Sequence, residues 1–171
     1  MPVRYPIMAV LVSAIIVFLA IAAFRAWRSR ANAQAAKFSA PLEWLEHPSG
    51  GRQWANLQYV ATSVRGEPLN RVTAHGLGSR GFGKITASTD GILIERTGER
   101  SIGIPFVQLQ GVSRATVAID RAVETDGLIQ IDWQQDGFEL STFLRATSND
   151  TRKNLYTYLT ELLGTKENAN G

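Results

Sequence analysis

The residues of this 171-residue chain that could do chemistry gather around one glycine-rich bend. Residues Gly76 to Gly81 follow the G-x-G-x-x-G pattern of a dinucleotide-binding loop, which needs a strand before it and a helix after it. Residues Phe82 to Ser88 have a strand pattern instead. The overlapping near-match to a phosphate-binding P-loop places Ile85 where a magnesium-binding hydroxyl is required. We therefore interpret the segment as a β bend and not as a nucleotide site.

Four basic side chains surround this bend, and together they could hold an anionic headgroup. Arginine in particular forms strong charge-assisted hydrogen bonds with phosphate. The alternative is a solvated loop whose charges face water, and both interpretations stay open. The four candidate lipid-headgroup contacts are Arg71, His75, Arg80 and Lys84.

The other polar residues give no catalytic or metal-binding pattern. The chain has no cysteine, which excludes disulfides, thiolate chemistry and cysteine-ligated zinc. Its two histidines, His47 and His75, lack both a recognisable nucleophile and the spacing of metal ligands. We expect no enzyme activity, no metal, no cofactor and no small-molecule substrate. Four acids that are close in sequence are interpreted as a solvated face: Asp120, Glu124, Asp126 and Asp132.

The net positive charge of the chain comes from its first 37 residues. This segment has five basic residues and no acid, whereas the rest has 13 Lys and Arg against 15 Asp and Glu, a net charge of −2. Nucleic-acid-binding domains concentrate positive charge on their folded part. We therefore expect no nucleic-acid partner.

An uncharged, apolar stretch from Ile7 to Phe24 predicts a transmembrane helix. As a helix it would be roughly 27 Å long, close to the bilayer's hydrocarbon thickness of about 30 Å. Aromatic residues bracket the stretch, and arginines whose long side chains can extend to the headgroups follow it. The expected membrane-interface anchors are Tyr5, Arg25, Trp27, Arg28 and Arg30.

Two other interpretations of this stretch are a cleaved signal peptide and a buried core helix. Residues Ala20 to Ala22 resemble a cleavage site, but a signal peptide has a shorter apolar region and carries its charge in front. A helix that is apolar on all sides is also unusual in the core of so small a domain. Because basic residues follow the stretch, the positive-inside rule places the N-terminus outside the plasma membrane and the C-terminal domain in the cytoplasm.

The chain divides into five expected segments. A helical extension from Arg25 to Ser39 is broken at Pro41, and β-type runs begin near Gln53. The segments are a short tail (1–6), a transmembrane helix (7–27), a juxtamembrane helix and linker (28–52), a folded domain (53–164) and a disordered tail (165–171).

The folded domain has the pattern of about seven antiparallel strands. The clearest pair is a hairpin that alternates through Ile129 to Gln134, turns at Asp136-Gly137 and returns through Phe138 to Leu144. Glycine and other turn residues separate the remaining runs. These expected strands are 57–64, 71–77, 83–88, 92–96, 101–105 and 112–119.

A C-terminal helix completes the domain. Thr147 or Ser148 can cap its start, Asp150 lies in its first turn, and Gly164 can end it. One apolar stripe predicts that the helix packs on the sheet. The stripe consists of Leu155, Leu159, Leu162 and Leu163.

This mainly-β layout with a C-terminal capping helix is typical of a pleckstrin-homology-like (PH-like) barrel or sandwich. Several runs also resemble actinobacterial single-pass membrane proteins with a bacterial PH-like domain, some of them labelled export or transporter proteins. The resemblance implies a membrane location and a PH-like fold, and it brings no catalytic residues. The runs that carry it are Tyr59–Thr62, Ala74–Gly78, Thr116–Arg121, Gly127-Leu128 and Trp133.

These patterns favour a non-enzymatic interaction or scaffolding module at the inner face of the plasma membrane. Its expected partners are the lipid bilayer and an unidentified membrane or cytoplasmic protein. PH-like folds suit strand addition by a peptide, here in a groove bordered by residues 101–105 and 112–119. The alternative is binding of anionic lipid headgroups at the basic bend, or a role as an accessory subunit of a membrane transport complex.

Overall fold

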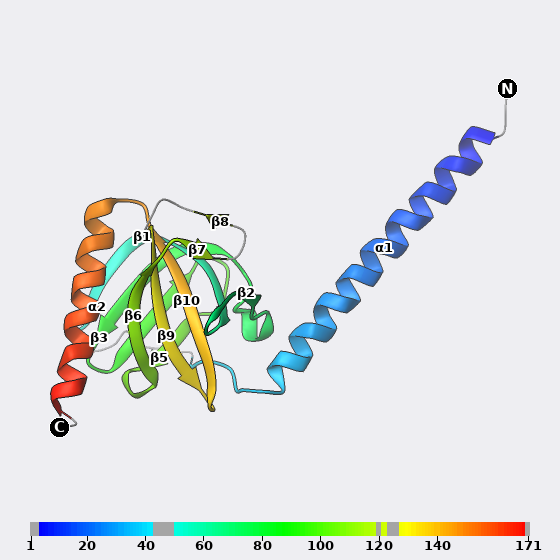
Figure 1. The fold of residues 1–171 in the computed structure, drawn as a ribbon. Coiled ribbons are helices and arrows are strands. Elements are labelled where there is room, and N and C mark those ends of the chain that lie inside the picture. The colour runs from blue at the N-terminus through cyan, green and yellow to red at the C-terminus, as the bar shows by residue number, and fades with distance from the viewer. Residues whose placement is uncertain (1–3, 43–49, 119–120, 123–126, 170–171) are drawn as a thin grey trace.

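The protein consists of one long helix and a β-rich body (Figure 1). The computed structural model describes residues 4–42, 50–118, 121–122 and 127–169. The long helix, α1 (Arg4–Ala35), stands clear of the body over most of its length. The body is a curved antiparallel sheet with a second helix, α2 (Asn149–Ala169), along its side. The expected mainly-β fold with a C-terminal helix is therefore confirmed.

Eight strands form the main sheet, close to the number expected. Their order is β5-β4-β3-β1-β10-β9-β6, and β2 pairs with β1 beside this path. A separate two-stranded ladder joins β7 (Val117–Ala118) and β8 (Arg121–Ala122). The main strands are β1 (Arg52–Val64), β2 (Glu67–Arg71), β3 (Gly81–Ser88), β4 (Gly91–Arg96), β5 (Ile102–Pro105), β6 (Leu109–Ala115), β9 (Leu128–Gln135) and β10 (Phe138–Ala146).

The long strand β1 gives the sheet its curvature. Its first part pairs with β3 and its second part with β10, so one strand belongs to both halves of the sheet. The β1–β3 register jumps from Trp54–Ile85 to Leu57–Gly83, which leaves a β-bulge between the two pairs. Asn56 in this bulge has a φ of 56°, which asparagine tolerates better than most residues.

The core lies inside the curved sheet. Its largest fully buried side chains include Trp133, Tyr59 and Phe143. Leu155, Leu159 and Leu162 of α2 are also buried, which confirms that the leucine stripe packs on the sheet.

A chain of buried hydrogen bonds crosses this core. Trp133 Nε1 lies 3.0 Å from Thr142 Oγ1, Thr142 Oγ1 lies 2.7 Å from Thr62 Oγ1, and Thr62 Oγ1 lies 2.7 Å from the Tyr59 hydroxyl. The Tyr59 hydroxyl donates to the Leu77 carbonyl at 2.7 Å. Because an indole nitrogen only donates and a carbonyl only accepts, every proton in this chain points from Trp133 towards Leu77.

The structure agrees with the sequence most closely at the hairpin. β9 and β10 pair in the expected register, and Asp136 and Gly137 have φ values of 50° and 80°. Both residues of the two-residue turn thus have the positive φ that a type I′ turn requires.

Three expectations about the elements are wrong. Residues 71–77 are not one strand, because β2 ends at Arg71 and a 3-10 helix, η1 (Ala74–Gly76), follows. Strand 112–119 is β6 followed by the separate β7. Gly164 does not end α2, which continues to Ala169 and so includes most of the expected disordered tail. Glycine inside a helix costs only about 1 kcal/mol, which the packed leucines on α2 can offset.

Gly83 is required for the pairing of β3 with β4, and its replacement by alanine should be strongly destabilising. An added Cβ would lie 1.8 Å from the Glu95 carbonyl oxygen, so the two strands would have to separate. We expect Gly83→Ala to lower the free energy of unfolding by about 3 kcal/mol. Urea unfolding of the full chain in detergent micelles, followed by tryptophan fluorescence, measures this loss.

Gly164→Ala is the matched control, since nothing lies within 4 Å of a Cβ built there. It should raise stability by about 0.5–1 kcal/mol, because alanine is a better helix residue. Equal stabilities of the two variants would contradict the close approach at Gly83.

Candidate functional site

The apolar surface of α1 is not covered by the domain. Met8–Ala35 is long and apolar enough to cross a membrane, with a mean hydropathy of 2.5, and none of its most apolar window is buried. Val10, Phe18 and Phe24 are each more than half exposed. A buried core helix is therefore excluded, whereas the membrane location itself stays a prediction.

The C-terminal end of α1 is bonded to the domain through Gln34. Its amide nitrogen donates to the Arg71 carbonyl at 3.1 Å. Its amide oxygen accepts from the Thr73 main-chain N–H at 2.7 Å and from the Thr73 hydroxyl at 2.9 Å. One side chain thus uses donor and acceptor together to hold the segment between β2 and η1.

Phe38 packs its ring into the domain just after α1. It is only 4% exposed, and its ring lies stacked on Phe138 and edge-on to His75, each at a centroid distance of 5.1 Å. His75 Nε2 lies 2.9 Å from the Phe38 carbonyl oxygen. Because a carbonyl only accepts, this nitrogen carries a proton.

The next residues continue along the domain. The Ser39 N–H donates to Asp136 Oδ2 at 2.6 Å, and Gln135 Nε2 donates to the Ser39 hydroxyl at 2.7 Å. Hydrogen bonds from Ser39 lower the pKa of the Asp136 carboxyl, since they favour its charged form. The Leu42 carbonyl accepts from the Gly103 N–H at 2.7 Å and so occupies part of the outer edge of β5. We call the contacts of Gln34, Phe38, Ser39 and Leu42 the juxtamembrane clamp.

Arg96 organises the glycine-rich bend. It is only 5% exposed, and its guanidinium donates to the carbonyls of Gly76 at 2.8 Å, Ser79 at 3.0 Å and Arg100 at 2.8 Å. Its charge also lies 4.7 Å from the centroid of the Tyr59 ring. The carbonyls of the bend are therefore already occupied by a positively charged side chain of the protein itself, that of Arg96. Sequence analysis did not identify Arg96, because its partners are carbonyls of distant residues.

The four basic residues expected to bind a headgroup have different surroundings. Arg71 ends β2 beside Gln34, and His75 belongs to the juxtamembrane clamp. Arg80 is exposed within the bend, and Lys84 Nζ lies 3.1 Å from Glu95 Oε2. Arg71, His75 and Lys84 thus each interact with other residues of the protein. Headgroup contact through the set stays a prediction.

The expected interface anchors lie along α1. Tyr5 is in its first turn, and Arg25, Arg28 and Arg30 are in its C-terminal third. Trp27 is 54% exposed, with its ring 6.2 Å from that of Phe24. Their roles at a bilayer stay predictions.

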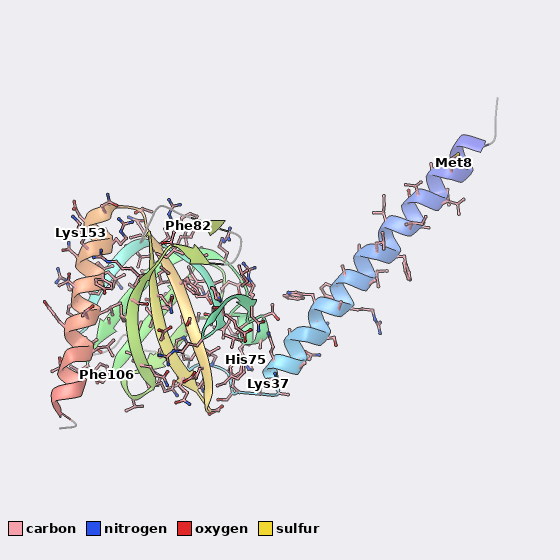
Figure 2. All side chains as sticks on the ribbon, viewed as in Figure 1. Met8, Lys37, His75, Phe82, Phe106 and Lys153 are labelled. Carbon is pink, nitrogen blue, oxygen red and sulfur yellow. The ribbon has the colours of Figure 1, made fainter. Side chains whose placement is uncertain are left out.

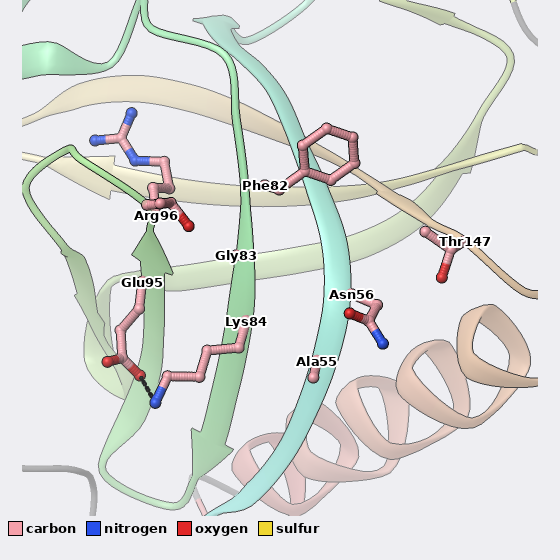
Figure 3. A pocket seen from close by; sticks show the side chains of 9 residues that line it. Ala55, Asn56, Phe82, Gly83, Lys84, Glu95, Arg96 and Thr147 are labelled. Atoms are coloured by element: carbon pink, nitrogen blue, oxygen red, sulfur yellow. Dashed lines mark ion pairs between the residues drawn. The ribbon is translucent and has the colours of Figure 1, made fainter.

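An open hollow of about 670 Å³ lies where the β1 bulge meets β3 and β4 (Figure 3). Its walls include Asn56, the Lys84–Glu95 ion pair and Thr147. Phe82 stands at its rim and is 61% exposed. No sequence pattern predicts this hollow, because the β-bulge that shapes it has no local signal.

The acidic residues do not form the expected solvated face where the structure describes them. Asp132 is only 8% exposed and accepts from the Ser141 hydroxyl at 2.5 Å and from Gln130 Nε2 at 2.8 Å. Strand alternation gives the face on which a residue lies, but not whether neighbouring side chains cover that face. Asp120, Glu124, Asp126 and His47 lie outside the described residues. Within the described ranges, no group of three or more His, Cys, Asp or Glu side chains could hold a metal ion.

The fold and the juxtamembrane clamp together define the class of this protein: it has a PH-like domain held at the end of an apolar helix. A family model described as "Bacterial PH domain-like" matches residues 45–160, and the chain belongs to this family. Among solved structures, it is similar to a chain of "The 8S snRNP Assembly Intermediate", with 14% identity over 69% of this chain and 86% of that chain and a TM-score of 0.48. No curated protein matches the sequence. The PH-like fold is thus confirmed, while the actinobacterial origin and the transporter label stay predictions.

Phe38→Ala should loosen the juxtamembrane clamp. Truncating a buried phenylalanine costs about 3–5 kcal/mol, here directed at the junction of helix and domain. The chain has no cysteine, so spin labels on Trp27→Cys and Val107→Cys report the distance between α1 and the domain without background. We expect a narrow distance distribution that broadens in the variant.

Phe18→Ala is the control, because Phe18 is 70% exposed on α1, far along the helix from the clamp. An unchanged narrow distribution in Phe38→Ala would show that the clamp does not fix the helix.

Tyr59 should make stability depend on pH in the alkaline range. Burial raises the pKa of its phenol from 10.0 to about 12, against smaller lowering effects of Thr62, Arg96 and Arg71. Above pH 10 the unfolded chain loses this proton first, so stability falls as pH rises from 10 to 12 and is fully present below 10. The free energy of unfolding falls by about 3 kcal/mol over this pH range. Urea unfolding across this pH range measures it, and Tyr59→Phe should show a flatter dependence from a lower starting stability.

Proposed function

We propose that this chain is a single-span membrane protein whose PH-like domain acts as a non-enzymatic protein-interaction module at the inner face of the plasma membrane. The exposed apolar surface of α1 supports the membrane span, because an apolar patch of this size on a soluble monomer would be rare. Basic residues after the apolar stretch and their near absence before it support a cytoplasmic domain.

The observation that supports the interaction role is a difference between the two edges of the main sheet: one is partly covered by the chain itself and the other is not. β5 and β6 stand at the two ends of the strand order. Leu42 of the juxtamembrane clamp bonds to the outer edge of β5 at Gly103. Among the described strands, β6 pairs with β9 alone. The site for strand addition is therefore β6, and not the whole groove expected between the two strands.

Helix α2 flanks this edge and would form the second wall of the binding site. The Arg114 guanidinium of β6 lies 4.5 Å from the centroid of the Tyr156 ring on α2. An extended peptide that adds to β6 would gain main-chain hydrogen bonds from the strand and side-chain contacts from the helix. A partner in the same membrane would meet the domain at a raised effective concentration.

Site-specific photocrosslinking in native membranes tests this role. Benzoylphenylalanine at the exposed positions Gln110 and Arg114 of β6 should form an adduct with the same partner protein. The exposed position Asn154, on the opposite face of α2 from Tyr156, is the matched control and should give none. An adduct of equal yield from all three positions, or from Asn154 alone, would contradict strand addition at β6.

The side of the membrane on which the domain lies is measured in the same cells with Val107→Cys. Val107 is 81% exposed on η2 (Phe106–Gln108). A membrane-impermeant maleimide should label it only after the membrane is opened. Labelling in intact spheroplasts would place the domain outside.

A further inference from the structure

Phe82 is a large aromatic side chain exposed on an otherwise well-packed strand. It is 61% exposed, whereas Ile85, Thr86 and Ala87 further along β3 are buried. Beside it lies the open hollow at the β1 bulge, whose walls carry the polar side chains of Asn56 and Thr147. An aromatic ring next to hydrogen-bonding groups suits the boundary between an apolar phase and water.

The juxtamembrane clamp sets how far the domain lies from the membrane. Gln34 is bonded to the domain only seven residues after Trp27, which corresponds to about 10 Å along a helix. A domain of about 100 residues has a radius of gyration of about 13 Å, so it is wider than this gap. Since Trp27 would mark the headgroup level, the domain surface turned to the bilayer must lie at the headgroups.

The direction of α1 determines which surface this is. α1 leaves the clamp near Lys37 and runs obliquely away from the domain towards Met8 (Figure 2). Phe82 lies ahead of Lys37 along the direction in which α1 runs, whereas Lys153, in the first turns of α2, lies on the side of the domain away from α1. Phe106 of η2 lies at the opposite end of the domain from Phe82.

We infer that the end of the domain carrying Phe82 rests on the headgroup layer of the bilayer that α1 spans, with the Phe82 ring inserted as a second interfacial anchor. This inference rests on the proposed membrane span. The hollow beside Phe82 gives room for a headgroup. The contact lies on the outer face of β3, where Lys84 in the wall of the same hollow is paired with Glu95.

A bilayer explains these features better than a protein partner does. The clamp already requires a lipid surface close to this end, and a partner would have to fit into the gap of about 10 Å. Phe82 protrudes as a single ring beside polar walls, as the aromatic residues of membrane interfaces do.

The environment of a fluorophore at position 82 tests the inference in the full chain. Phe82→Cys is labelled with nitrobenzoxadiazole, which reacts at one site because the chain has no cysteine. In vesicles of phosphatidylcholine and phosphatidylglycerol, its emission should shift to the blue and be quenched by lipids with a nitroxide near the headgroup. Val107→Cys, at a position that is 81% exposed at the opposite end, is the control and should show neither effect.

Two further probes separate the possible failures. Phe18→Cys on α1 should be quenched by a nitroxide on the acyl chain if the helix spans the bilayer. Quenching at 18 without quenching at 82 overturns the inference and leaves the proposed span intact, whereas no quenching at 18 overturns the span. Quenching at Leu69→Cys on the exposed β2 hairpin, with none at 82, would show that a different face rests on the membrane.

Discussion

The juxtamembrane clamp is the constraint on which the arrangement of this protein depends. Gln34 and Phe38 bond the end of α1 to η1 and to the β9–β10 hairpin, two parts of the domain that are far apart in sequence. A flexible linker would let the domain present any face to its surroundings. The clamp instead attaches the end of the helix to the domain through several contacts, so we expect the orientation of the domain to follow that of the helix.

The clamp in turn depends on internal order at the glycine-rich bend. Arg96 holds the bend through the carbonyls of Gly76 and Ser79, and Tyr59 holds Leu77 at the end of a hydrogen-bond chain from Trp133. His75 lies between these residues, and its φ of 53° places its ring against Phe38. The buried polar network is therefore the support on which the helix docks, and a motif that resembles a nucleotide loop serves packing.

The sequence predicted those elements of the structure that local residue patterns determine. The apolar α1, the leucine stripe of α2 and the Asp136-Gly137 hairpin each carry a periodic or turn signal, and each is present. The clamp had no such signal, because Gln34 and Phe38 stand in an alanine-rich segment and gain their roles only from partners in the domain. Asp132 was misjudged for a related reason, since its burial depends on neighbouring strands and not on alternation. The role of each of these residues is determined by contacts with residues that are distant in sequence.

Anchoring in a membrane also raises the risk that an unpaired sheet edge pairs with the same edge of another copy. Copies confined to one membrane meet at raised concentration, so two open edges per domain would favour pairing between copies. The chain's own Leu42 covers part of the β5 edge. On β6, the bulge at Gln110 and the charge of Arg114 interrupt a flat, apolar edge, and α2 restricts access to it. An edge built in this way disfavours a second copy of itself, yet a peptide that matches the bulge and the helix can still add to it.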